Sequence, residues 1–256
     1  MFWSSLLKDV DLGFSWVEQN TNKCFVLVDD VWNEEAAMSA KVYDHRMSLT
    51  DMGVFRTGGY EDVDYGATSS TEYFQNGIWT AGPKLPGGLY KHCQVTIGST
   101  VYVAGIKIMR NPTKIFEFVS GGHFNGDFFN PHLFALENQN GSWIKMADMK
   151  HGRADAGCIE FDGKLWMIGG YSNTSEFYDP TTNIWTEGPL YPAGHPNDHV
   201  FEFDGTLYAM NDWNLMIYKL DLKIQEWIGV QQFNLSESSW QHWKPPPLVH
   251  PQTLHC

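Results

Sequence analysis

A fixed interval between tryptophans and glycines constrains the fold of this chain more than any other feature. Four tryptophans share an interval of 26 positions: Trp32 to Gly58, Trp79 to Gly105, Trp143 to Gly169 and Trp185 to Asn211. In the last copy an asparagine takes the place of the glycine. A repeat of this length indicates one supersecondary unit, copied several times, which must stack on its neighbours to bury its apolar face.

The segments inside each copy have the pattern of β-hairpins. Residues 161–170 align with residues 203–212, and both contain an Asp-Gly pair between two β-rich runs. Asp-Gly tolerates the positive φ angles that a two-residue hairpin turn requires. A further aromatic run, a polar turn and the tryptophan follow, without helical periodicity. Four short strands per copy predict the four-stranded blade of an all-β propeller.

The third copy carries the most complete motif. It contains Gly169-Gly170, Tyr178-Asp179-Pro180 and Trp185, and the first copy repeats part of this order with Gly58-Gly59 and Trp79. With these motifs, from about Trp32 to Trp227, the chain resembles the kelch-repeat family. The resemblance implies a kelch-type β-propeller. The remaining copies are degenerate, with Ile106 after one glycine and Asn211-Asp212 in place of another pair.

The spacing also predicts the number of blades within a single domain over residues 1–256. Four copies are complete, and a fifth blade is expected from residues 1–32 together with the C-terminal segment, because propellers usually close by joining both chain ends. A fragment of a six-bladed propeller is the alternative. The three prolines at 245–247 are expected to end strand pairing, which leaves a tail at about 245–256.

One copy is longer than the others. Its glycine and tryptophan are 38 positions apart, against 21 in the first copy and 16 in the last two, and the excess over 16 places an insertion of 22 residues at about 106–131. This segment is rich in phenylalanine (Phe116, Phe118, Phe124, Phe128 and Phe129). These side chains are expected either to form an apolar docking patch beside the channel or to pack against the side of the blade.

Composition narrows the class of partner. With 30 acidic and 17 basic residues the formal net charge is −13, which disfavours nucleic acid and membrane surfaces and favours a protein or peptide, possibly a basic one. The N-terminus lacks the pattern of a signal peptide, so a cytoplasmic location is expected. The four cysteines, Cys24, Cys93, Cys158 and Cys256, show no paired spacing and are expected to be reduced and buried.

The resemblance implies which loops contact a partner. In kelch proteins that bind peptides, these loops follow the double glycine or precede the first strand of a blade. The first set here contains Tyr60, Asp62, Tyr171, Asn173, Asp212 and Trp213. The second contains Asp155 and Asn197, with Arg153 as the single arginine nearby. Because no arginine cluster faces the same way, an acidic or phosphorylated ligand is not expected.

The sequence shows no catalytic motif. The expected function is therefore a non-catalytic protein-interaction module, without metal or cofactor, and the alternative is a small-molecule or sugar-processing enzyme with its site in the channel. Glu160 and Glu202 share one face of equivalent strands and are the acids considered for that alternative. The resemblance implies two further roles, because kelch propellers often act as substrate receptors of ubiquitin ligases or as actin-associated scaffolds. A ligase role is not expected, because the adaptor-binding domain of the ligase type is expected N-terminal to the propeller and only 31 residues precede Trp32.

Overall fold

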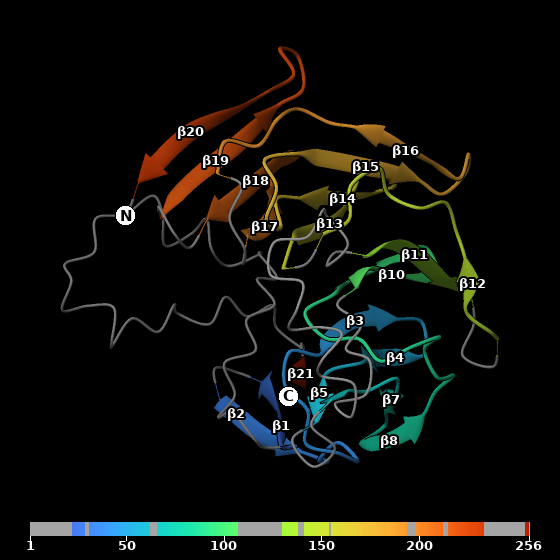
Figure 1. Cartoon of the computed structure of the whole chain (residues 1–256). Coiled ribbons are helices and arrows are strands. Elements are labelled where there is room, and N and C mark those ends of the chain that lie inside the picture. The colour runs from blue at the N-terminus through green and yellow to red at the C-terminus, as the bar shows by residue number, and fades with distance from the viewer. Residues whose placement is uncertain are drawn as a thin grey trace, which may run out of the picture.

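Four antiparallel sheets of four strands each stand around a common centre (Figure 1). The computed structural model describes residues 22–28, 31–61, 66–106, 130–137, 141–153, 155–193, 198–211, 215–232 and 254–255. Within these ranges there is no helix, and so none of the length and hydropathy that crossing a membrane requires. The predicted all-β propeller of four-stranded blades is confirmed.

We number the four sheets as blades I to IV in chain order. Blade I contains β3 (Arg46–Thr50), β4 (Gly53–Thr57), β7 (Thr71–Gln75) and β8 (Ile78–Ala81), with a small ribbon of β5 (Tyr60–Glu61) and β6 (Gly66–Ala67) beside it. Blade II contains β9 (Cys93–Ile97), β10 (Thr100–Ile106), β11 (Asn130–Leu136) and β12 (Ile144–Lys145). Blade III contains β13 (Gly157–Phe161), β14 (Lys164–Ile168), β15 (Ser175–Asp179) and β16 (Ile184–Glu187). Blade IV contains β17 (Asp198–Phe203), β18 (Thr206–Asn211), β19 (Met216–Asp221) and β20 (Glu226–Gln232).

The repeated tryptophans join successive parts of the ring by an equivalent hydrogen bond. The indole nitrogen donates to a backbone carbonyl that lies four positions after the preceding tryptophan: Trp79 to Ala36 at 2.8 Å, Trp143 to Pro83 at 3.0 Å and Trp185 to Ala147 at 2.9 Å. An indole N–H that leaves water needs such an acceptor. The contact therefore recurs in three copies, whereas the indole nitrogen of Trp227 in the fourth is buried without a hydrogen-bond partner among the described residues.

The first strands of the blades form the inner ring. β9 contacts both β3 and β13, and β13 contacts β17. Because side chains alternate along a strand, β9 presents Gln94 and Thr96 to blade I, and Cys93 and Val95 to blade III. The inner ring thus positions the loops that precede each first strand around one axis.

A disulfide corrects the expectation of reduced cysteines. Cys93 in β9 and Cys158 in β13 are bonded, with their Cα atoms 6.0 Å apart, and Cys24 is also disulfide-bonded. The sequence separation of 65 residues gave no pairing signal. The two cysteines become neighbours only because consecutive first strands pack side by side in the ring. Such bonds persist mainly in oxidising compartments, and the cytoplasmic location stays a prediction.

A further sheet joins the two ends of the chain. It has three strands in the order β2 (Val31–Glu35), β1 (Cys24–Val28) and β21 (Leu254–His255), and all pair antiparallel. It lies next to blade I in Figure 1. The expectation that strand pairing ends at the prolines 245–247 is wrong, because β21 pairs after them. Without β21, β1 would have an unpaired edge on that side, and this short strand supplies the missing backbone hydrogen bonds.

The inserted segment joins the second and third strands of blade II. β10 and β11 pair directly, with a register shift between Ala104 and Ile106. Residues 107–129, with all five phenylalanines, lie outside the described residues, so the choice between a docking patch and side packing stays open.

Candidate functional site at the channel mouth

Three equivalent residues line one end of the inner ring. Asp44, Lys91 and Asp155 each stand two positions before the first strand of blades I, II and III. All three have positive φ angles, of 54°, 53° and 53°. Their backbones form a chain: Lys91 N–H donates to the Asp44 carbonyl at 3.0 Å, and Asp155 N–H donates to the Lys91 carbonyl at 3.4 Å. We call this group, with Arg46 and the tyrosines described below, the channel mouth.

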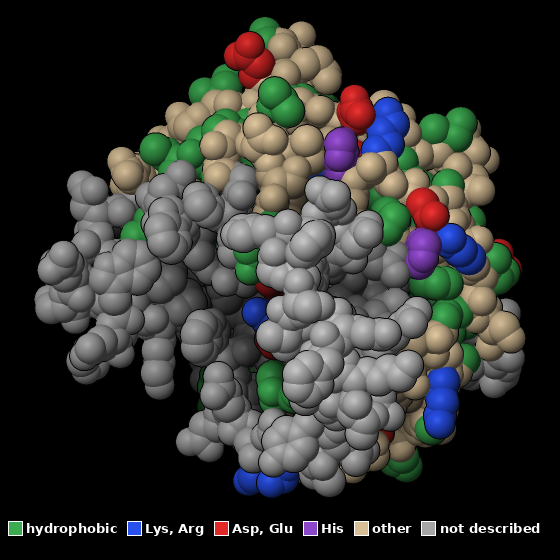
Figure 2. Space-filling view, viewed as in Figure 1, with side chains coloured by type: hydrophobic (Ala, Val, Ile, Leu, Met, Phe, Trp, Pro, Cys, Tyr) green, Lys and Arg blue, Asp and Glu red, His purple; other side chains and the backbone are tan. Residues whose placement is uncertain are grey.

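The charges of the channel mouth are mixed. Lys91 Nζ lies 3.6 Å from Asp155 Oδ1, with the lysine side chain 34% exposed and the aspartate 9%. Burial lowers the pKa of Arg46, and the charges of Asp44 and Asp155 oppose that effect. Basic and acidic side chains are visible in the hollow at the centre of the face in Figure 2. A ligand here would meet both a cation and carboxylates.

Three tyrosines flank these charges. The ring of Tyr60 lies 5.0 Å from that of Tyr43 and 5.5 Å from that of Tyr90. Tyr43 and Tyr60 also exchange backbone hydrogen bonds of 3.2 and 2.8 Å, which fix the loop after the double glycine of blade I. Tyr90 directly precedes Lys91. The expected contact residues Tyr60 and Asp155 are therefore linked through Tyr90 and Lys91.

In blade III the loop after the double glycine is exposed. Tyr171 stands where Tyr60 stands in blade I, and its side chain is 54% exposed at a positive φ of 61°. Asn173 is exposed too, and its carbonyl accepts a hydrogen bond from Tyr191 N–H at 2.7 Å. Tyr171 therefore offers an accessible aromatic surface on a loop that is anchored at Asn173.

Arg153 does not reach the surface. Its side chain is fully buried, donates to Glu176 Oε1 at 2.8 and 3.2 Å, and donates to the Gly169 carbonyl at 2.7 Å. Burial is the first cause that lowers the pKa of this guanidinium, and Glu176 opposes it. Its predicted role as a contact residue is thus not compatible with its position. The sequence placed Arg153 near the mouth but did not show that a carboxylate lies inside the blade.

Blade I has a matching pair that explains this position. Arg56 binds Glu72 at 2.9 Å and the Gly58 carbonyl at 2.7 Å, and Gly58 is the equivalent of Gly169. Arg56 lies in β4 and Arg153 in the segment before β13, yet both place their guanidinium groups at the same point of the blade. Each donates a hydrogen bond to the carbonyl of the first glycine in its double-glycine loop. Each arginine therefore stabilises that loop from inside the blade and is not itself available to a partner.

The other predicted contact residues lie outside the described residues, namely Asp62, Asn197, Asp212 and Trp213. Sequence reasoning missed Asp44, Arg46 and Lys91. The signal was available for Asp44 and Lys91, because they occupy the same position before a first strand as Asp155.

A layer of buried polar groups lies between blades I and II. Thr57 Oγ1 lies 2.8 Å from His92 Nε2 and also donates to Gln94 Oε1, whereas Gln94 Nε2 donates to Ser48 Oγ at 2.7 Å. Burial, followed by the charge of an arginine, lowers the pKa of His45 to about 3 and holds the pKa of His92 well below its usual value. Both histidines are therefore neutral near pH 7.

The two acids considered for catalysis stabilise turns. Glu160 Oε1 accepts a hydrogen bond from Gly163 N–H at 2.8 Å, and Glu202 Oε1 accepts one from Gly205 N–H at 3.0 Å. Both side chains are exposed. In the part of the chain that the structure describes, no group of three or more His, Cys, Asp or Glu residues is arranged to hold a metal ion.

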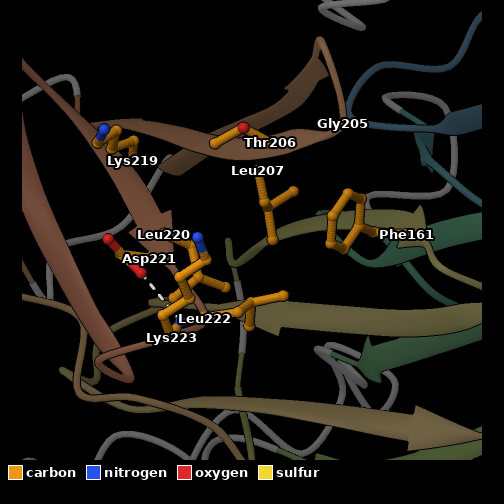
Figure 3. Close-up of a pocket in the computed structure, with 9 residues that line it drawn as sticks. All are labelled: Phe161, Gly205, Thr206, Leu207, Lys219, Leu220, Asp221, Leu222 and Lys223. Atoms are coloured by element: carbon orange, nitrogen blue, oxygen red, sulfur yellow. Dashed lines mark hydrogen bonds between the residues drawn. The ribbon is translucent and has the colours of Figure 1, made fainter.

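A small pocket lies between blades III and IV, away from the channel mouth. Its volume is 270 Å³ (Figure 3). Phe161, Leu207 and Leu220 form part of its apolar lining, and Lys219 and Asp221 lie at its edge. Phe161 ends β13, whereas Asp155 precedes it, so the pocket and the mouth lie toward opposite ends of that strand. It brings no catalytic pair together.

Comparisons with known proteins agree with this architecture. No protein-family model matches the chain. It is 22% identical to Kelch-like protein 23 of Homo sapiens over 84% of this chain and 46% of that protein. It is 28% identical to Kelch-like protein 40 of Xenopus laevis over 64% of this chain and 25% of that protein. It is also 28% identical to Kelch-like protein 35 of Mus musculus, over 67% of this chain and 26% of that protein. The chain therefore spans less than half the length of these relatives.

A solved structure shares the fold. The structure of YjhT superimposes with a TM-score of 0.62 at 15% identity, covering 72% of this chain and 63% of that one. Together with the four-stranded blades and the equivalent tryptophan contacts, these similarities show that the chain has the fold of a kelch-type β-propeller.

Proposed function

We propose that this propeller is a non-catalytic interaction module that binds a protein or peptide at the channel mouth. The observation that carries the proposal is the position of Lys91 between Asp44 and Asp155, together with the half-buried Tyr60, whose ring packs against the buried Tyr90. Tyrosines supply contact area at low entropic cost, and charged groups supply directed hydrogen bonds. Rigid blades hold these groups, which reduces the entropy lost on binding.

The charge of the whole chain favours a partner with a basic group. In the channel mouth Asp44 and Asp155 face two bases, Lys91 and Arg46, whereas the whole sequence carries a net charge of −13. Such a partner would be attracted at long range by the net charge and positioned at short range by the carboxylates. Association with a ubiquitin ligase or the cytoskeleton stays a prediction from the resemblance to kelch proteins.

Selection from a random peptide library on the intact chain tests the proposal. We expect enriched peptides to carry Lys or Arg, and Tyr171→Ala or Asp44→Ala to weaken their binding about tenfold, as a contact residue worth more than 1 kcal/mol would. Ile184→Ala is the matched control, because Ile184 is 56% exposed on the outer strand of blade III. Peptides that bind all three variants as tightly as the unmodified chain would rule out the mouth as the binding face. The three variants and the unmodified chain must have equal melting temperatures, so that weaker binding does not result from unfolding.

A further inference from the structure

The partner of one disulfide-bonded cysteine follows from the others. The chain has four cysteines. Cys93 and Cys158 are bonded to each other, Cys24 is disulfide-bonded, and no described cysteine is free. Within one chain, Cys256 alone is left to pair with Cys24. Cys256 itself lies outside the described residues.

The register of the terminal sheet supports the same pair. β21 pairs with β1 so that His255 faces Phe25 and Leu254 faces Val26. A ladder continued in this register would set position 256 opposite Cys24. Directly opposite residues have Cα atoms roughly 4.5–5.5 Å apart, and disulfides need Cα separations of roughly 4.4–6.8 Å, so this register is compatible with the bond.

We propose that a disulfide between Cys24 and Cys256 clasps the two ends of the chain and closes the propeller. β21 contributes two residues, and its backbone pairing alone is a small contact. Cys24 is fully buried and packs in a cluster with Met38 and Val42, so it is held in place on the β1 side. A covalent bond from this fixed point retains the C-terminal strand on the sheet. This inference does not depend on the proposed binding function.

Formation of the clasp requires a disulfide oxidant. The thiolate of one cysteine attacks the oxidant's disulfide and forms a mixed disulfide, releasing one oxidant thiol. The second cysteine thiolate then displaces the other oxidant sulfur. Overall, two protons and two electrons pass from the two cysteines to the oxidant, which leaves as a dithiol. The clasp and the bond between blades II and III therefore both place folding in a compartment that supplies such an oxidant.

Peptide mapping of the full chain tests the clasp. The protein is produced in an oxidising compartment, denatured, alkylated without reduction and digested, and the cross-linked peptides are identified by mass spectrometry. We expect one peptide pair that joins Cys24 to Cys256 and another that joins Cys93 to Cys158, both lost on prior reduction. Alkylated Cys24 and Cys256, or Cys24 joined to any other cysteine, would overturn the proposal.

Variants separate the clasp from folding. In Cys256→Ser we expect faster hydrogen exchange at 24–28, because β21 is no longer retained, with the bond between blades II and III intact. Cys158→Ser is the matched control and should keep the bond between Cys24 and Cys256. Unchanged exchange at 24–28 in Cys256→Ser would show that the clasp does not hold the sheet.

Discussion

Strand β9 joins blade I through hydrogen bonds and joins blade III through a disulfide and apolar contacts. Toward blade I, Gln94 donates to Ser48 and to the Phe55 carbonyl, and Thr96 donates to Ser48. Toward blade III, Cys93 bonds Cys158 and Val95 packs in the same buried cluster. Both junctions use alternate residues of the same five-residue strand.

The difference lies in the contacts of the inner strands, because a buried apolar cluster that contains Phe55, Val103 and Leu136 also joins blades I and II. Each junction buries its surface, but the polar junction does not pair all of its polar groups, because His92 Nδ1 is buried without a hydrogen-bond partner in the part of the chain that the structure describes. The polar junction, however, includes His45 and His92, which burial keeps neutral. The apolar junction contains no histidine among the residues of its buried cluster. The two junctions are therefore expected to respond to different perturbations.

Removal of the disulfide should have the largest effect. The bond spans 65 residues of sequence, and the loss of this constraint on the unfolded chain is expected to lower the free energy of unfolding by about 4 kcal/mol. Cys93→Ala with Cys158→Ala, measured by urea unfolding under non-reducing conditions, checks this value. Equal stability of this variant and the unmodified chain would show that the covalent bond does not stabilise the junction.

Acid should weaken the polar junction selectively. The pKa of His45 is about 3 in the folded protein and about 6.5 in the unfolded chain, so the unfolded state binds more protons between these values. Stability is therefore complete above about pH 6.5 and falls as the pH decreases toward 3, by about 2 kcal/mol at pH 5 from His45 alone. Hydrogen exchange at pH 5 and 8, corrected for intrinsic rates, should show the larger loss of protection at 45–57 and 92–96. A larger loss at 157–168 would contradict this assignment.

Two reciprocal substitutions on neighbouring residues of β9 should differ least in their effect on the free energy of unfolding. Val95→Thr places a hydroxyl in the apolar junction, where it should cost about 2 kcal/mol. Thr96→Val removes one 2.8 Å hydrogen bond to Ser48 from a half-buried site and should cost about 1 kcal/mol. The two substitutions change the same atoms in opposite directions on neighbouring residues. Equal costs in urea unfolding would show that the two faces of β9 do not differ in polarity.

The candidate site was only partly predictable. Tyr60, Tyr171 and Asp155 could be assigned by their distance from the glycines and from the first strands, because turn position is a local property. The burial of Arg153 could not, because it depends on Glu176, which comes from a different strand. The same limit applies to Lys91, whose carboxylate partner belongs to the next blade.

The sequence by itself determined the blade. The tryptophan interval, the Asp-Gly turns and the strand alternation all arise from contacts within a repeat or between one repeat and the next, and each leaves a regular trace in the order of residues. Only the tertiary structure decided which residues meet across the inner ring. Stacking of blades II and III brings Cys93 to Cys158, and closure of the ring brings β21 to β1. Both contacts span large sequence separations and depend on the packing of whole blades rather than on any local pattern.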